Sequence, residues 1–191
     1  VEFHQKFFLV YDRNSQLINT FYVVSDCPDT NGLIKKGNEN VVDARLTDAE
    51  YFWEKNKSKN MIKQVSLLDN INYFKGLGSY LDKVQRLKKI GGLLSDEFLI
   101  SKEKVELACT LSKVDLLSES VNEFPELQGI LGGYFAEAQG FDKEISESIK
   151  DQYLPSGPGS VIPRNNYSIA LSISDKIDTL VGFFGLNIIP T

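Results

Sequence analysis

From residue 39 onward, apolar side chains recur at spacings of three and four, and this periodicity constrains the fold more than any other feature. Such spacing places apolar groups on one face of an α-helix. Long helices are predicted at residues 40–57, 77–98, 102–121 and 166–184, and shorter ones after Pro125 and after Asp142. The helix over 102–121 is apolar on most of its circumference, which is typical of a buried, central helix.

The helix over 77–98 illustrates the pattern used for these predictions. Its expected buried stripe consists of Leu77, Leu81, Val84, Lys88, Gly91, Leu94 and Phe98. The loop-forming segment 155–160, rich in proline, glycine and serine, separates the last predicted helix from the others. Together these segments predict a helical bundle.

The first 38 residues follow a different pattern. Residues 7–11 and 17–24 are rich in aromatic and β-branched side chains, and residues 12–15 between them have turn-forming composition. This arrangement predicts a β-hairpin. Because two strands alone are marginally stable in water, the hairpin is expected to belong to a larger sheet with strands upstream. The predicted fold class is α+β, mostly α, with a domain division between residues 38 and 39.

Composition limits the partners and the compartment. The net charge of −5 argues against a nonspecific nucleic-acid coat but permits a local basic patch. Cys27 and Cys109 are too few for a disulfide framework or a four-cysteine zinc site, so two free thiols in a reducing cytoplasm are expected. No apolar run approaches the ~20 residues of a membrane-spanning helix. The start lacks an initiator Met and a signal peptide, so we expect an internal piece of a longer protein.

Few residues are of the types that perform catalysis. The single histidine, His4, has no ligand-type neighbours at metal-binding spacing, which favours a structural role. Phosphate-binding loops, nucleophile elbows and CxxC pairs are absent from the sequence. The glycine-containing segments 76–78 and 129–133 follow no predicted strand, so helix ends or close helix packing explain them better than phosphate binding.

The remaining candidates are two pairs of carboxylates, a basic cluster and a second, weaker basic patch of Lys55, Lys57, Lys59 and Lys63. Asp115 with Glu119, and Asp175 with Asp178, are each three or four residues apart and share a helical face. We interpret both pairs as partners of Lys113, Lys176 and other basic groups rather than as metal or acid–base sites. The basic cluster contains Lys83, Arg86, Lys88 and Lys89. It suits contacts to nucleic-acid phosphates, although charge alone favours a solvated helix face.

Ordered motifs along the whole chain resemble the glycyl-tRNA synthetase β-subunit family. They are His4–Phe8, Gly37–Leu46, Asp48–Trp53, Leu77–Val84, Glu123–Gly129, Ala170–Leu180, Val181–Gly185 and Ile189–Thr191. The resemblance implies an assembly of two α and two β subunits in which the α subunit holds ATP, magnesium and glycine. It implies that the β subunit recognises tRNA(Gly). This chain then needs no cofactor of its own, and its partners are the α subunit and tRNA(Gly) in the cytoplasm.

The same resemblance divides the chain. Residues 1–38 correspond to the end of an editing-like β domain, and residues 39–191 to a helical domain related to the histidine–aspartate (HD) phosphohydrolases. The metal-binding positions of those enzymes align here with Tyr80, Ser112, Lys113 and Asp175, of which only Asp175 keeps a ligand type. An ammonium group at Lys113 would repel a metal cation. We therefore predict no catalytic residue and no metal site, and propose Lys83, Arg86 and Lys113 as candidate tRNA-binding residues.

Two alternatives stay open. The first is a metal-dependent HD-type phosphohydrolase with an atypical ligand set, which stoichiometric bound manganese, iron or zinc would favour. The second is a pure assembly scaffold that contacts the α subunit but not tRNA, which footprinting of tRNA(Gly) would distinguish. Under every reading the chain alone is expected to be inactive in aminoacylation, because the sequence contains no ATP-binding motif.

Overall fold

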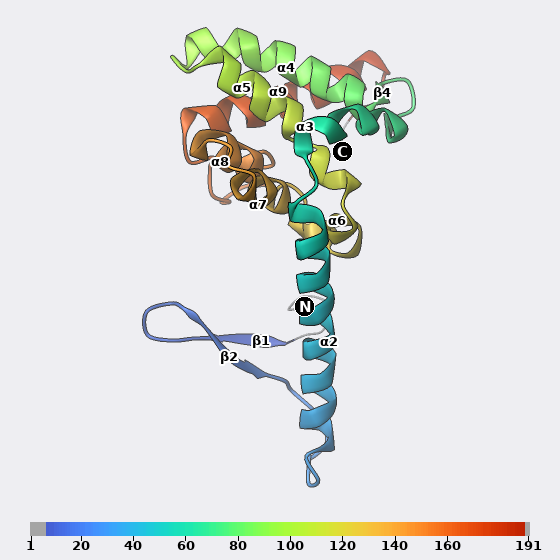
Figure 1. The fold of residues 1–191 in the computed structure, drawn as a ribbon, viewed down its shortest axis with the longest axis vertical. Helices are drawn as coiled ribbons and strands as arrows, with labels where there is room; N and C mark the ends of the chain where they lie inside the picture. The colour runs from blue at the N-terminus through green and yellow to red at the C-terminus, as the bar shows by residue number, and fades with distance from the viewer. Residues whose placement is uncertain (1–6, 190–191) are drawn as a thin grey trace. The chain divides into compact units, whose positions relative to one another are not determined.

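The computed structural model describes residues 7–189, so His4 and part of the first and last family-like motifs lie outside the described residues. The chain forms two compact units that divide between Phe52 and Trp53 (Figure 1). The predicted fold class, mostly α with an N-terminal β-hairpin, is confirmed. Among the described residues, no helix combines the length and apolar character needed to cross a membrane.

In the first unit, β1 (Phe8–Tyr11) and β2 (Leu17–Tyr22) form the predicted antiparallel hairpin. Phe8 faces Tyr22 across the ladder, and an irregularity falls between Leu9 and Tyr11. The turn is held by Asp12, whose carboxylate accepts from the backbone N–H groups of Asn14 and Gln16 at 2.8 Å. This is the side-chain turn chemistry expected of aspartate.

The helix α2 (Leu33–Lys57) begins seven residues earlier than predicted. The Asp29 carboxylate accepts from the N–H groups of Ile34 at 3.1 Å and Lys35 at 2.9 Å. The first turn of α2 is therefore capped by a residue four positions before the helix begins. Asn38, a poor helix former, donates its side-chain amide to Ile34 O at 2.8 Å. The predicted division at residue 38 therefore falls inside a continuous helix.

The second unit consists of short and long helices with one small hairpin. In chain order these elements are α3 (Met61–Gln64), η1 (Val65–Asn70), β3 (Asn72–Phe74), β4 (Gly78–Ser79), α4 (Tyr80–Glu97), α5 (Lys102–Leu111), η2 (Val114–Leu117), α6 (Glu119–Glu123), η3 (Pro125–Leu127), α7 (Ile130–Ala138), α8 (Lys143–Asp151) and α9 (Asn166–Gly185). α4 packs against α5 and α9, and α8 packs against α7 and α9 (Figure 1). The result is a bundle whose centre lies between α4, α5, α8 and α9.

The prediction of a single helix over residues 102–121 is wrong, because the helix that begins there is shorter. α5 ends at Leu111, Lys113 leaves helical geometry at φ −115°, and two short helical turns follow. Serine side chains explain the interruption, because they bond to nearby backbone in place of the helical ladder. Ser112 donates to Cys109 O at 2.8 Å, and Ser118 caps the next helix. The break places Lys113 at a helix end in the centre of the bundle.

The segment before α4 also differs from the expectation. Gly76 and Gly78 have φ values of +91° and +82° and join β3 to β4, so these glycines do follow a strand, one too short to give a sequence pattern. α4 begins at Tyr80 rather than 77, because Ser79 and Asp82 form a reciprocal capping box. The turn and cap together fix the direction in which α4 enters the bundle.

Close packing of α7 on α8 explains the glycines near residue 133, as the sequence predicted. A methyl group on Gly133 would lie 2.5 Å from the backbone oxygen of Ser146. We expect Gly133→Ala to lower the free energy of unfolding by about 1–3 kcal/mol, although alanine is the better helix former by ~1 kcal/mol. The matched control is Gly37→Ala in α2, which meets nothing within 4 Å and should be neutral or stabilising. Urea unfolding of both variants measures the difference, and equal effects would contradict the packing argument.

Candidate functional site

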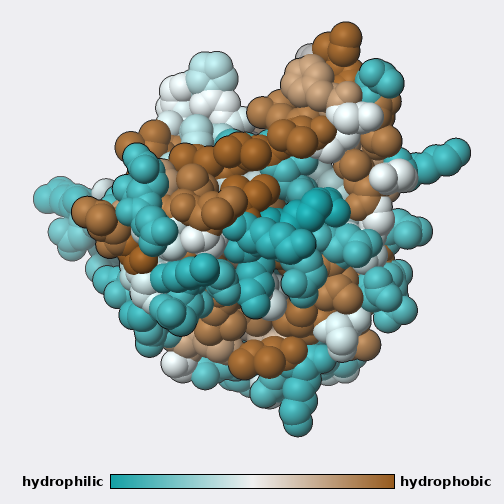
Figure 2. Space-filling model, turned by 90° about the horizontal axis from the view of Figure 1, so that it is seen from above, coloured by the Kyte–Doolittle hydropathy of each residue, from teal (hydrophilic) through white to brown (hydrophobic). Residues whose placement is uncertain are grey.

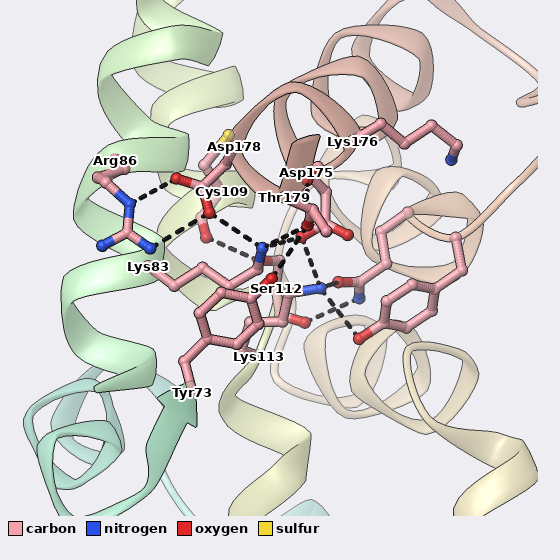
Figure 3. A network of polar contacts seen from close by, with 12 residues as sticks. Tyr73, Lys83, Arg86, Cys109, Ser112, Lys113, Asp175, Lys176, Asp178 and Thr179 are labelled. Carbon is pink, nitrogen blue, oxygen red and sulfur yellow. Dashed lines mark hydrogen bonds and ion pairs between the residues drawn. The ribbon is translucent and has the colours of Figure 1, made fainter. Parts of the chain in front are cut away.

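The residues singled out from the sequence meet in the interior of the bundle (Figure 3). α4 contributes Lys83 and Arg86, the end of α5 is followed by Lys113, and α9 contributes Asp175 and Asp178. We call these five residues the buried charge cluster. Three cations and two carboxylates thus lie together although they come from three separate parts of the chain.

Lys113 is the centre of the cluster and is 1% exposed. Its Nζ lies 3.1 Å from Asp175 Oδ1, and it donates to Gln152 Oε1 at 2.7 Å and to the Tyr153 hydroxyl at 3.0 Å. Gln152 is itself held by donating to Ser112 O at 2.8 Å. All three donor directions of the ammonium group are therefore occupied from within the protein.

Lys83 approaches the same carboxylates from α4. Its Nζ lies 3.1 Å from both Asp175 Oδ1 and Asp178 Oδ2, and it donates to Thr179 Oγ1 at 3.1 Å. The Tyr73 ring covers the ammonium group at 4.2 Å from the ring centroid. A buried lysine is stable only when it is paired and hydrogen-bonded in this way.

Arg86 completes the cluster at its edge. Its guanidinium donates to Asp178 through Nε at 2.5 Å and Nη2 at 3.3 Å, and Nη1 donates to Leu77 O at 3.1 Å. The side chain is 37% exposed, whereas the side chain of Lys83 is 3% exposed. Only the outer part of Arg86 reaches the surface.

The electrostatic balance keeps Asp175 ionised. Burial opposes its ionisation, but the charges of Lys113 and Lys83 outweigh burial and hold the pKa of Asp175 below its ordinary value. Burial raises the pKa of the Tyr153 hydroxyl, with Asp115 and Asp175 adding to the effect, so that phenol stays neutral. The cluster is a fixed arrangement of charges rather than a set poised for proton transfer.

The remaining HD-like positions do not supply metal ligands. Tyr80 is half-buried with its ring against Tyr73 at 5.3 Å, and burial raises the pKa of its hydroxyl. Ser112 uses its hydroxyl to bond Cys109 O. Across residues 7–189, no group of three or more histidine, cysteine or acidic side chains converges. Asp175 faces two ammonium groups, and this donor set does not fit a divalent cation.

The interpretation of the acidic pairs as partners of basic groups is confirmed for Asp175, Asp178 and Glu119 but is wrong for Asp115. Asp175 and Asp178 pair with α4 and with Lys113, while Lys176 donates to Leu154 O at 2.8 Å. Asp115 and Glu119 do not act together. Glu119 pairs with Lys55 and Lys59 at 2.9 Å, and Asp115 is buried elsewhere against the backbone N–H of Gly129.

The tRNA-binding prediction for Lys83 and Lys113 meets a physical objection in this geometry. A lysine that contacts phosphate needs an accessible ammonium group, and both lysines are buried and fully paired. Their burial argues for a structural role. Of the three candidate residues, Arg86 alone has an accessible side chain, and its contact with tRNA stays a prediction.

Sequence reasoning also missed four members of the surrounding network. Tyr73 and Thr179 contact Lys83, and Gln152 and Tyr153 contact Lys113. Thr179 lies one helical turn after Asp175, so its spacing in the sequence indicates that it shares the face of α9 that carries Asp175. The other three come from elements whose packing on α4 and α9 has no local signature.

Comparison with known proteins identifies relatives of this chain. The family described as "Glycyl-tRNA synthetase beta subunit" matches residues 1–191. The glycine–tRNA ligase β subunit of Thermodesulfovibrio yellowstonii is 40% identical over 98% of this chain, and that of Solidesulfovibrio magneticus is 39% identical over all of it. The corresponding protein of Phenylobacterium zucineum is 37% identical over 98% of the chain. These alignments cover 28–29% of the relatives, so the chain spans less than a third of their length.

The family match over residues 1–191 and the identities of 37–40% over 98–100% of the chain agree with one another. The chain belongs to the glycyl-tRNA synthetase β-subunit family.

Proposed function

We propose that this chain is an internal part of the β subunit of a glycine–tRNA ligase, where it serves tRNA binding and subunit assembly. The relatives that it resembles over its whole length carry that name. In this proposal an α subunit performs ATP- and magnesium-dependent glycylation of tRNA(Gly) in the cytoplasm. The chain itself performs no chemical step.

One observation carries the non-catalytic part of the proposal. The interior position that would have to hold a catalytic cation contains the ammonium groups of Lys83 and Lys113, each 3.1 Å from Asp175 Oδ1. A further divalent cation there would face two positive charges and one shared carboxylate oxygen. The phosphohydrolase alternative is therefore not favoured.

Arg86 allows the tRNA-binding role to be separated from the scaffold alternative. In the assembled ligase, we expect Arg86→Ala to raise the KM for tRNA(Gly) about tenfold, as the loss of a charge-assisted hydrogen bond of ~1.5 kcal/mol implies. The KM values for glycine and ATP should stay unchanged, since they belong to the proposed α-subunit site. Steady-state glycylation kinetics with each substrate varied in turn measure all three constants.

The controls address folding and charge. Arg86→Lys keeps the positive charge and should recover part of the tRNA affinity, whereas Arg13→Ala in the exposed β1–β2 turn should leave it unchanged. Melting temperatures of the assembled variants show whether the loss of the Asp178 contact disturbs the fold. An unchanged KM for tRNA in Arg86→Ala would contradict the predicted contact between Arg86 and tRNA and would favour the scaffold alternative.

A further inference from the structure

α9 has an unusual distribution of side chains for a helix that packs within a bundle. Its buried face is rich in polar groups, including Ser168, Ser172, Ser174, Asp175 and Asp178. Its outward face over the last two turns is apolar and consists of Ile177, Leu180, Val181 and Phe184, which are 40–67% exposed. These four residues follow the i, i+3, i+4, i+7 spacing of a single stripe.

The stripe borders a groove between α9 and α4. The groove has a volume of about 480 Å³ and is lined mainly by apolar atoms, with Leu77, Ile90, Ile177 and Val181 among its walls. Leu93, one turn further along α4, is 79% exposed and continues the surface. Figure 2, viewed from above Figure 1, shows hydrophobic patches alternating with hydrophilic side chains on that face of the molecule.

Charge distinguishes one rim of this groove. Arg86 and Asp178 at its wall neutralise each other. Lys89 also lines the groove, is exposed, and forms no ion pair with any residue in the described part of the chain. An occupant with an apolar stripe and one carboxylate near Lys89 would complement both the shape and the charge of the groove.

The size of the groove favours a tethered occupant over a free one. A stable interface between separate proteins uses about 20–30 residues on each side, whereas nine residues line this groove. A segment of the same polypeptide needs far less contact area, because its tether supplies a high effective concentration. The relatives are more than three times as long as this chain, so the full-length β subunit provides such segments.

We propose that an amphipathic helix from another part of the same β subunit docks in the α4–α9 groove, with its apolar stripe against α9 and a carboxylate on Lys89. The inference rests on the proposed function only in placing this chain within a longer β subunit. Because Arg86 lines the same groove, an occupied groove would compete with tRNA for the exposed part of its side chain.

The test compares two cysteine variants of the full-length β subunit, Val181→Cys and Val161→Cys. Val161 is a matched control, since it is 71% exposed against 67% for Val181 and lies in the loop before α9. A groove occupied nine-tenths of the time by a tethered helix should slow alkylation of the new thiol in Val181→Cys about tenfold relative to the one in Val161→Cys. Peptide mass spectrometry follows each site separately, with glycylation by the assembled ligase recorded in parallel.

Each outcome decides the proposal. Slow alkylation of the Val181→Cys thiol in the isolated β subunit at every protein concentration supports it, particularly if Lys89→Glu removes the protection and Lys63→Glu on the exposed side of α3 does not. Equal rates for the two variants, protection that rises with β-subunit concentration, or protection that requires the α subunit would each overturn it. Failure of the unsubstituted assembled protein to glycylate tRNA(Gly), with protection of Val181→Cys intact, would count against the proposed function alone.

Discussion

Replacement of Asp175 by alanine is expected to lower the free energy of unfolding of the chain by about 3–5 kcal/mol, the usual range for removing one partner from a buried ion pair. The carboxylate lies 3.1 Å from the ammonium groups of both Lys83 and Lys113. Without it, Lys113 would keep only neutral partners in a site where it is 1% exposed. Lys83 would retain Asp178, so Lys113 carries most of the expected loss.

Urea unfolding at pH 7 measures this effect, and a surface pair provides the comparison. Asp142 lies 2.7 Å from Lys104, but both side chains are partly exposed at 55% and 35%. Asp142→Ala should therefore cost less than about 1 kcal/mol. Equal losses in the two variants would show that the buried charge cluster does not stabilise the fold.

A double variant tests the reason for the loss. Adding Lys113→Met to Asp175→Ala replaces the uncompensated charge with an apolar side chain of similar length. The double variant should recover a substantial part of the stability lost in Asp175→Ala. If the second substitution instead adds a further independent loss, the cost does not arise from an unpaired buried ammonium group.

Periodicity was sufficient to predict where most helices lie and most of the buried face of α4. Val84 and Gly91 are buried, and Leu81, Leu94 and Phe98 pack against the core. The predicted stripe included Lys88, which is only half-buried and lies 3.7 Å from Glu106. The buried residues that the predicted stripe did not include are Lys83, Leu87, Gly92 and Ser95. Lys83 precedes Leu87 by four residues, so it occupies a core position that a hydrophobicity pattern assigns to an apolar residue.

The site was predictable from the sequence only in part, for a related reason. The i, i+3 spacing of Asp175 and Asp178 indicated paired carboxylates facing basic groups, and this is confirmed. Which lysines form ion pairs with these carboxylates depends on how α4 and the end of α5 pack against α9. That approach depends on the helix break at Ser112 and Lys113, where a serine hydroxyl competes with helical hydrogen bonding.

Asp115 is the second residue whose substitution is expected to change the stability strongly. It differs from Asp175 because no basic side chain in the described part of the chain forms an ion pair with it. The side chain is 1% exposed, and its Oδ2 accepts from the Gly129 N–H at 2.5 Å. Its Oδ1 has no hydrogen-bond partner among the described residues. Burial raises the pKa of Asp115 from its ordinary value of 3.8 to about 6. The folded protein therefore binds this proton more tightly than the unfolded chain does.

The sign of the pH dependence follows from that difference. Between about pH 4 and pH 6 the folded state holds more protons than the unfolded state, so the contribution of Asp115 to stability is present below pH 4 and is lost as pH rises through 6. The loss is on the order of 3 kcal/mol, because one pKa unit corresponds to about 1.4 kcal/mol. An asparagine side chain at this position would have no charge to bury.

We therefore expect Asp115→Asn to be nearly neutral at pH 4 and to raise the free energy of unfolding by about 2–3 kcal/mol at pH 8. Urea unfolding of both proteins between pH 4 and pH 8 measures the difference, in which the other titrating groups cancel. A difference for Asp115→Asn that is independent of pH would mean that the carboxyl group ionises in the folded protein near the same pH as in the unfolded chain, so that burial does not raise its pKa.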